Sequence, residues 1–128
     1  MTVAVSKGYL VRRLDDAPVA QCSCGQSTRP LTSADTSVCN LHVTFITDSV
    51  KHYHRETTEV YYILEGCGKM ELNDDVIDVE PGMIIYVEPF TAHRLISPEG
   101  VRTIVFGVPA YRQDDEYFVT RKPADRSP

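Results

Sequence analysis

Short runs of β-branched, aromatic and aliphatic residues alternate with turn residues from Leu41 onward. The runs cover residues 41–46, 60–64, 69–72, 76–79, 83–87, 93–96 and 102–108. Runs of this length and composition predict β-strands, and Asn73-Asp74-Asp75 between two of them predicts a hairpin, because Asn and Asp tolerate a positive φ. No stretch between the runs has a convincing helical pattern, so the chain is predicted to be all-β, a sandwich or a barrel.

The segments on either side of these runs have a different pattern. Residues 1–40 show no sustained period and are predicted to form a loop-rich N-terminal arm of the same domain, while residues 41–110 hold the predicted barrel. Residues 111–128 are rich in charge, so we expect a solvated or frayed C-terminal tail. A chain of 128 residues has room for one domain.

Composition places the chain among ordinary folded proteins. Hydrophobic residues make up 42% and charged residues 24%, which is enough apolar side chain for a core. The net charge is -5 and the basic residues are scattered, which argues against a nucleic-acid partner. The longest apolar run, at residues 83–87, is far shorter than a membrane span requires, so no membrane is expected either.

The four cysteines bear on the cellular compartment. The first 14 residues lack the pattern of a signal peptide, so we expect a cytoplasmic protein with reduced thiols. Cys22 and Cys24 are too close in sequence to bridge each other without strain. They resemble a soft-metal or redox pair, but zinc would need two further ligands and only Cys39 and Cys67 remain, so we favour plain thiols. The sequence assigns no role to any of the four.

Three histidines and a glutamate carry the candidate chemistry. His52 and His54 are two residues apart, so in an extended strand their imidazoles lie on one face. If the chain reverses before Glu59, that carboxylate returns to the same interior, and His93 comes from a later strand. Three imidazoles and a carboxylate suit a divalent first-row metal, whereas an isolated His-x-His pair would be weak evidence for one.

The spacing of these residues resembles the cupin family. In that family a His-x-His is followed by a Glu and, after six more residues, by a Gly, which is Gly66 here, and a second motif supplies a later His. The resemblance covers residues 41–108 and implies a double-stranded β-helix, or jelly-roll barrel. It also implies one divalent metal per chain, Fe, Mn, Zn or Ni, with the ligands His52, His54, Glu59 and His93.

Four positions depart from the family pattern. Ile46 stands where the first motif usually has Gly, and Ser97 stands where the second commonly has Asn. Glu88 and Phe90 replace a Pro and a Gly of the second motif. Because Pro89 and Thr91 still offer a turn, we interpret these departures as changes in loop geometry that keep the site.

Side-chain parity extends the prediction to the wall of the site. If Glu59 points inward, Tyr61 and Ile63 do so too. Tyr61 could then hydrogen-bond a substrate oxygen or act as an acid, and the alternative is that it packs with its hydroxyl satisfied. His42 shares its parity with Thr44, which places it on the polar face of its strand, with a supporting role behind a metal ligand as the alternative.

These features favour a metal-dependent enzyme. A divalent ion with one carboxylate ligand keeps a charge of roughly +1, which predicts a small anionic organic ligand such as a hydroxy acid, a carboxylate or an enolate. Fe(II) would favour dioxygenase chemistry, the option that we prefer from the sequence, and Mn, Zn or Ni acting as a Lewis acid would favour an isomerase or lyase.

A non-catalytic module that binds a sugar or another metabolite is the alternative to an enzyme. A general base beyond the metal ligands would distinguish the two classes, and the sequence offers Tyr61, Glu88 and residues 114–116 for that role.

Assembly is the last expectation. A barrel this small has open sheet edges, and an arm with little internal pattern gains stability by lying across a partner's edge. We therefore predict a homodimer. The cupin resemblance implies the same, since many members pair through an N-terminal segment.

Overall fold

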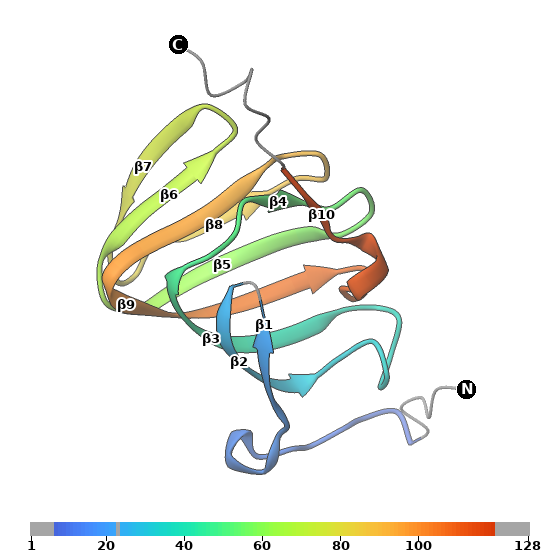
Figure 1. Ribbon diagram of the computed structural model, residues 1–128. Helices are drawn as coiled ribbons and strands as arrows, with labels where there is room; N and C mark the ends of the chain where they lie inside the picture. The colour runs from blue at the N-terminus through green and yellow to red at the C-terminus, as the bar shows by residue number, and fades with distance from the viewer. Residues whose placement is uncertain (1–6, 23, 120–128) are drawn as a thin grey trace.

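The computed structural model describes residues 7–22 and 24–119 and is built almost entirely of strands (Figure 1). Its elements in chain order are η1 (Leu14–Asp16), β1 (Val19–Cys22), β2 (Gly25–Leu31), β3 (Asn40–Asp48), β4 (His52–Tyr53), β5 (Thr58–Glu65), β6 (Gly68–Leu72), β7 (Asp75–Val79), β8 (Ile84–Val87), β9 (His93–Val108), η2 (Gln113–Asp115) and β10 (Tyr117–Phe118). The all-β prediction is confirmed. No helix in these residues is long and apolar enough to cross a membrane, and the cytoplasmic location stays a prediction.

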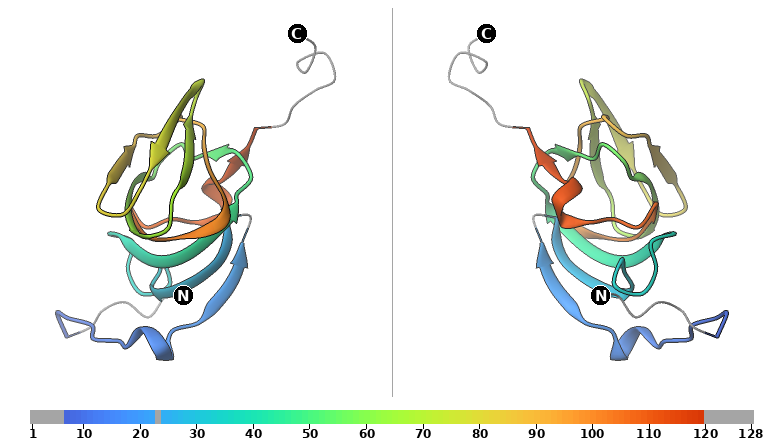
Figure 2. Two further views of the ribbon diagram at one scale, coloured as in Figure 1. Left: turned by 90° about the vertical axis from the view of Figure 1, so that its left-hand side faces the viewer. Right: turned by 90° about the vertical axis from the view of Figure 1, so that its right-hand side faces the viewer.

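One antiparallel sheet curls round on itself to form the jelly-roll barrel (Figures 1 and 2). The long strand β9 organises it: the first part of β9 pairs with β4 and β6, and its second part pairs with β3 and β5. Strand β8 extends the sheet beside β5, and β7 does so beside β6. The predicted hairpin joins β6 to β7, with Asn73 at φ 55°. The runs predicted at 93–96 and 102–108 are therefore the two halves of one strand.

Alternating side chains fill the inside of the barrel. On β5, Glu59, Tyr61 and Ile63 are buried while Tyr62 is 41% exposed, which confirms the predicted parity. The apolar part of the interior consists of Ile46, Tyr61, Ile63, Met70, Val79, Ile85, Val87, Leu95, Val101 and Val105. Polar side chains line the remainder, so the barrel carries a hydrophobic core and a polar chamber in one interior.

The polar face of β3 turns out to be a buried face. Asn40, His42 and Thr44 are all less than 8% exposed, and His42 and Thr44 line the interior cavity. Polarity alone does not say which face of a strand meets water, because a barrel that holds a polar site reverses the usual relation. His42 therefore belongs to the chamber.

The N-terminal arm contains a hairpin that the sequence analysis did not predict. Strands β1 and β2 pair with each other, and β2 continues the sheet by pairing with β3. At the hairpin, Gly25 has a φ of 133°, and a Cβ there would lie 2.3 Å from the carbonyl oxygen of Phe45. The hairpin is held by backbone pairing and close approach to β3, neither of which leaves a hydrophobic period in the sequence.

The predicted solvated or frayed tail is only partly right for residues 111–119, which we call the C-terminal strap: residues 112–114, 118 and 119 are exposed, but the strap forms η2 and β10. Residues 120–128 lie outside the described part. Strand β10 of the strap pairs with β4, and Asp115 is 2% exposed. The Asp115 carboxylate accepts hydrogen bonds from the backbone N–H groups of Arg55 (3.0 Å), Glu56 (3.1 Å) and Thr57 (3.2 Å). These donors form the turn between β4 and β5. Asp115, which its acidic surroundings in the sequence suggested to be in solvent, therefore anchors this turn.

The departures from the cupin motifs are accommodated by the backbone. Phe90, where the second motif usually has Gly, has a φ of 69°, and its N–H donates to the carbonyl of His54 at 2.7 Å. The loop thus keeps the left-handed conformation with a side chain that rarely adopts it. Ile46 is 1% exposed and joins the core.

Replacing Asp115 with alanine tests the anchor. Because three backbone N–H groups would lose a charged acceptor, we expect the free energy of unfolding at neutral pH to fall by about 2–4 kcal/mol. The control is Asp114→Ala, since the neighbouring side chain is 78% exposed, and its effect should stay within roughly 0.5 kcal/mol. Urea unfolding measures both.

The difference in the free energy of unfolding between the wild type and Asp115→Ala should depend on pH. Burial alone would raise the pKa of Asp115, but the three N–H groups outweigh it and lower that pKa. The stabilisation is therefore fully present above about pH 4, the ordinary Asp value, and is lost as the pH falls through the folded-state pKa. If Asp115→Ala loses as much unfolding free energy at about pH 2 as at neutral pH, the ionised carboxylate of Asp115 is not the source of the stabilisation.

Candidate metal centre

Four buried side chains converge at one place inside the barrel. His52 comes from β4, His54 follows it, Glu59 comes from β5, and His93 begins β9 directly opposite His52. Their exposures are 6%, 3%, 6% and 1%, and one potential ligand atom from each lies within 4.8 Å of all the others. The structure thus brings together the four residues that the sequence analysis selected.

Backbone carbonyls hold all three imidazole rings. In each ring Nδ1 faces a carbonyl oxygen, and because a carbonyl only accepts, Nδ1 carries the proton and donates it. In a neutral ring, Nε2 then presents a lone pair to the centre of the cluster. The pairs are His52 Nδ1 with Val50 O (2.8 Å), His54 Nδ1 with Asp115 O (2.9 Å) and His93 Nδ1 with Thr91 O (2.8 Å).

The atoms at the centre are therefore acceptors facing one another. Oε1 of Glu59 lies 3.2 Å from Nε2 of His93 and 3.3 Å from Nε2 of His54. The buried His54 Nε2 is near that oxygen but makes no hydrogen bond of acceptable geometry. Lone pairs at this separation repel unless a proton or a metal ion lies between them. Three ring nitrogens and one carboxylate oxygen form a donor set that is consistent with a single metal site.

The charges of the cluster follow from burial and from these contacts. Burial alone would raise the pKa of Glu59, but His54 and His93 outweigh it and hold that pKa well below its usual range. Burial, with the nearby His93, lowers the pKa of His52. For His54, burial lowers the pKa and the Glu59 contact more than offsets this, so the net direction is upward. The cluster thus contains an ionised carboxylate and a His52 ring that favours its neutral form.

A cavity of about 50 Å³ adjoins the cluster. Besides His52, His54 and Glu59, its lining comes from the hairpin, from β3, β5 and β9, and from the strap. These further lining residues are Cys22, Cys24, Arg29, His42, Thr44, Ile46, Tyr61, Val105, Tyr111 and Glu116. The cavity suits a small ligand beside the four-residue cluster.

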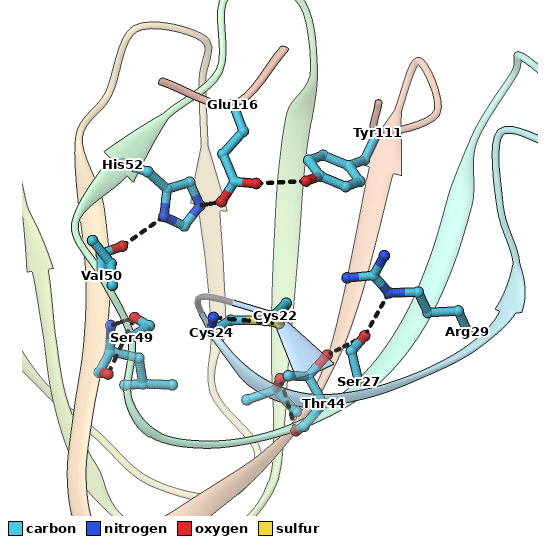
Figure 3. The surroundings of a disulfide bond; sticks show 12 residues. Cys22, Cys24, Ser27, Arg29, Thr44, Ser49, Val50, His52, Tyr111 and Glu116 are labelled. Carbon is cyan, nitrogen blue, oxygen red and sulfur yellow. Dashed lines mark hydrogen bonds and ion pairs between the residues drawn. A yellow bond between two sulfur atoms is a disulfide. The ribbon is translucent and has the colours of Figure 1, made fainter. Parts of the chain in front are cut away.

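Glu116 brings a second carboxylate to the cavity (Figure 3). One of its oxygens accepts a hydrogen bond from the Tyr111 hydroxyl at 2.5 Å, and the other lies 3.8 Å from Nε2 of His52. Burial, aided by Glu116, raises the pKa of Tyr111, which therefore stays protonated and donates. The backbone N–H of Tyr111 is held by the side-chain oxygen of Asn40 at 2.7 Å.

The other candidates for a general base have different surroundings. Tyr61 is 6% exposed and lines the cavity, and burial, with the charge of Glu59, raises its pKa well above the ordinary value. Glu88 is exposed and does not line the cavity. Of residues 114–116, Asp115 is the anchor and Glu116 faces the cavity. The acidic run was a usable signal, but its charge suggested a solvated tail.

The expectation that all four cysteines are thiols is wrong for Cys22 and Cys24, which form a disulfide (Figure 3). Cys22 ends β1 and Cys24 comes directly before β2, and their Cα atoms are 5.1 Å apart, within the ordinary range for a disulfide. Sequence separation was a poor guide, because a tight turn brings the two side chains to one side. Cys39 and Cys67 are free.

Comparison with known sequences gives both a family and relatives. The Cupin domain family matches residues 42–107. An uncharacterized protein of Methanocaldococcus jannaschii is 35% identical over 66 residues, which are 50% of this chain and 53% of that protein. A glucose-6-phosphate isomerase of Thermococcus litoralis is 43% identical over 53 residues, 36% of this chain and 28% of the isomerase. The chain thus spans about half, or less, of the length of these relatives.

Solved structures share the fold over most of the chain. A protein from Planctomyces limnophilus has a TM-score of 0.80 at 25% identity, covering 88% of this chain and 98% of its own. Pac13 of Streptomyces, a nucleoside dehydratase, has a TM-score of 0.73 at 15% identity, covering 88% and 94%. Because the family match spans the strands that supply all four clustered side chains, this chain belongs to the cupin family.

Proposed function

We propose that this cupin is a metal-dependent enzyme in which His52, His54, Glu59 and His93 hold one divalent first-row metal ion. The observation that supports this most directly is the geometry of the cluster: four buried acceptor atoms within 4.8 Å, with each ring oriented by a backbone carbonyl. Three nitrogen donors and one oxygen donor suit Fe, Mn, Zn or Ni.

The proposed substrate is a small anionic metabolite. A divalent ion with Glu59 as its one anionic ligand keeps a charge of roughly +1, which attracts a carboxylate, a hydroxy acid or an enolate. The cavity of about 50 Å³ is small for a nucleoside or a sugar phosphate, the compounds that the names of the similar proteins indicate. We therefore propose an acid of a few carbon atoms.

Glu116 favours an enzyme over a binding module. A module that only holds its ligand needs no proton acceptor, whereas this cavity has a carboxylate next to His52 and oriented by the hydroxyl of Tyr111. When bound, the metal would supply Lewis acidity at a substrate oxygen. Glu116 would take a proton from the substrate and return it, and Tyr61, kept protonated by its raised pKa, would donate a hydrogen bond to a substrate oxygen.

These roles fit isomerase or lyase chemistry best. The isomerase and dehydratase names of the similar proteins support the same class of proton transfer. Dioxygenase chemistry is the second candidate, because the three-histidine and one-carboxylate donor set also suits Fe(II). The two differ in whether oxygen is consumed.

Removing one ligand tests the metal site. His93→Ala should weaken metal binding as severely as His52→Ala or His54→Ala, by more than the ~10–100-fold that even a residue behind the ligands costs. The matched control is His42→Ala, another buried imidazole of the cavity wall that lies outside the cluster. Elemental analysis after dialysis against a chelator measures occupancy. Full occupancy in His93→Ala would show that the ligand assignment is wrong.

Glu116→Gln tests the proton-transfer role. The amide keeps the size of the side chain but no longer accepts a proton, so exchange of the C–H protons of pyruvate with deuterated water should slow by about 10²–10⁴-fold in the metal-loaded protein. Metal content should not change. Glu88→Gln, an exposed control, should exchange at the wild-type rate. Nuclear magnetic resonance follows the exchange.

Two results would count against this role. Exchange at the wild-type rate in Glu116→Gln would remove Glu116 from the mechanism. A metal-loaded wild-type protein that promotes neither proton exchange nor oxygen uptake with small acids would favour the binding module.

We also infer that the protein is a homodimer. The hairpin already lies along β3 of its own chain, so the main support is the outer face of β5, β8 and β9. Tyr62 pairs there with Ile84, and Val60 lies between Tyr86 and Phe106. Ile84 and Tyr86 are 63% and 60% exposed. Monomeric proteins rarely leave a contiguous apolar face of this kind in water.

Light scattering at micromolar concentration measures the assembly. We expect twice the chain mass of 14.4 kDa for the wild type. Tyr86→Lys should shift the protein toward the chain mass, whereas Val76→Lys, a 58% exposed position on β7, should not. A wild-type mass of one chain would contradict the homodimer.

A further inference from the structure

Arg29 occupies a part of the cavity wall that the proposed reaction does not use. It lies on β2, is half-buried, and contributes to the cavity lining together with Glu116 and the metal cluster. Figure 3 shows its guanidinium pointing toward the space between Tyr111 and the Cys22–Cys24 disulfide. A positive charge therefore lies on the wall of the same small chamber as the cluster.

Two contacts orient the guanidinium. Its Nε–H donates to the hydroxyl oxygen of Ser27 at 3.1 Å, and this oxygen, on a fully buried side chain, also accepts a hydrogen bond from Thr44 at 3.2 Å. The guanidinium lies 5.9 Å from the ring centroid of Tyr111, within cation–π distance. These contacts use Nε and one face of the group. The two terminal nitrogens remain to bind the paired oxygens of a carboxylate.

Arg29 has no carboxylate at ion-pair distance among the described residues, whereas Arg12, Arg94 and Arg112 each have at least one. The nearby His42 is neutral at neutral pH and adds no second positive charge. Burial is the main cause, and the charge of Arg29 is the second, of a His42 pKa lowered to about 4. A half-buried cation without an anionic partner is costly, and a bound anion would compensate it.

The charges around the chamber indicate a role for Arg29 in binding an anion. A divalent ion with Glu59 as its ligand keeps a charge of roughly +1, which attracts a chelating group. Arg29 adds a second positive charge at a different place on the wall of the same chamber. A ligand that only chelated the ion would leave Arg29 uncompensated.

We infer that Arg29 binds a carboxylate of the substrate and thereby selects acids that have a carboxylate in addition to their metal-chelating group. The inference rests on the proposed function and narrows it, from any small anion to a small hydroxy or oxo dicarboxylate. Arg29 is thus a specificity-determining residue contributed by the hairpin of the N-terminal arm.

Calorimetric titration of the metal-loaded protein with lactate, tartronate and malate tests this. All three share a chelating 2-hydroxy acid group, and tartronate and malate add a second carboxylate at two different distances. A charged, paired hydrogen bond predicts that the better of the two dicarboxylates binds about 10- to 100-fold tighter than lactate. Equal affinity of the wild type for all three acids would overturn the inference.

Variants of Arg29 test whether this residue is the source of the preference for dicarboxylates over lactate. Arg29→Met should bring the dicarboxylate preference over lactate to about one, with metal content unchanged, and Arg29→Lys should keep part of the preference. Arg102→Met is the matched control, because Arg102 lies 6.0 Å from the Phe45 ring and is exposed outside the cavity. It should keep the full preference.

The outcomes separate this inference from the proposed function. A full preference in Arg29→Met, with metal bound, would overturn the assignment of Arg29 and leave the metal site standing. A wild-type protein that holds no metal by elemental analysis would overturn the proposed function, and the inference with it.

Discussion

The arrangement of this protein depends on bringing four acceptor atoms together inside a barrel. Nε2 atoms of His52, His54 and His93 and a carboxylate oxygen of Glu59 meet in a buried place. His93 Nε2 lies 3.2 Å from the Glu59 oxygen, and His54 Nε2 has no hydrogen bond of acceptable geometry. Backbone carbonyls fix the three rings from behind. The lone pairs on the other side of the rings, with the carboxylate of Glu59, form a donor set that is consistent with a single metal ion.

Two terminal segments add walls to the chamber beside this cluster. The N-terminal hairpin brings Arg29 and the cysteine pair to one wall, and the C-terminal strap brings Tyr111 and Glu116 to another. The strap also supports the cluster directly, because the carbonyl of Asp115 accepts the Nδ1–H of His54 while its carboxylate caps the turn before β5. One residue thus links the closing segment, the reversal of the chain and the orientation of a candidate ligand.

Charge is distributed unevenly over the chamber. The acidic groups lie at the cluster and on the strap, while the cation on the hairpin is held by a hydroxyl and an aromatic ring. This separation allows a ligand with two polar ends to be matched at both, within a cavity of about 50 Å³. The strands of the barrel hold the cluster in place. The two terminal segments determine the size of the cavity and the charges on its wall.

The sequence by itself determined the fold class, most of the strands and the four clustered residues. These signals are local: alternation along β5 places Glu59 and Tyr61 on one face, and a two-residue spacing places His52 beside His54. Only the tertiary structure decided the rest. The burial of the polar face of β3, the N–H donors of Asp115 and the position of Arg29 on the cavity wall were not predictable in this way. Each depends on segments brought together from distant parts of the chain. The pattern along one strand does not identify the distant segment that packs against it.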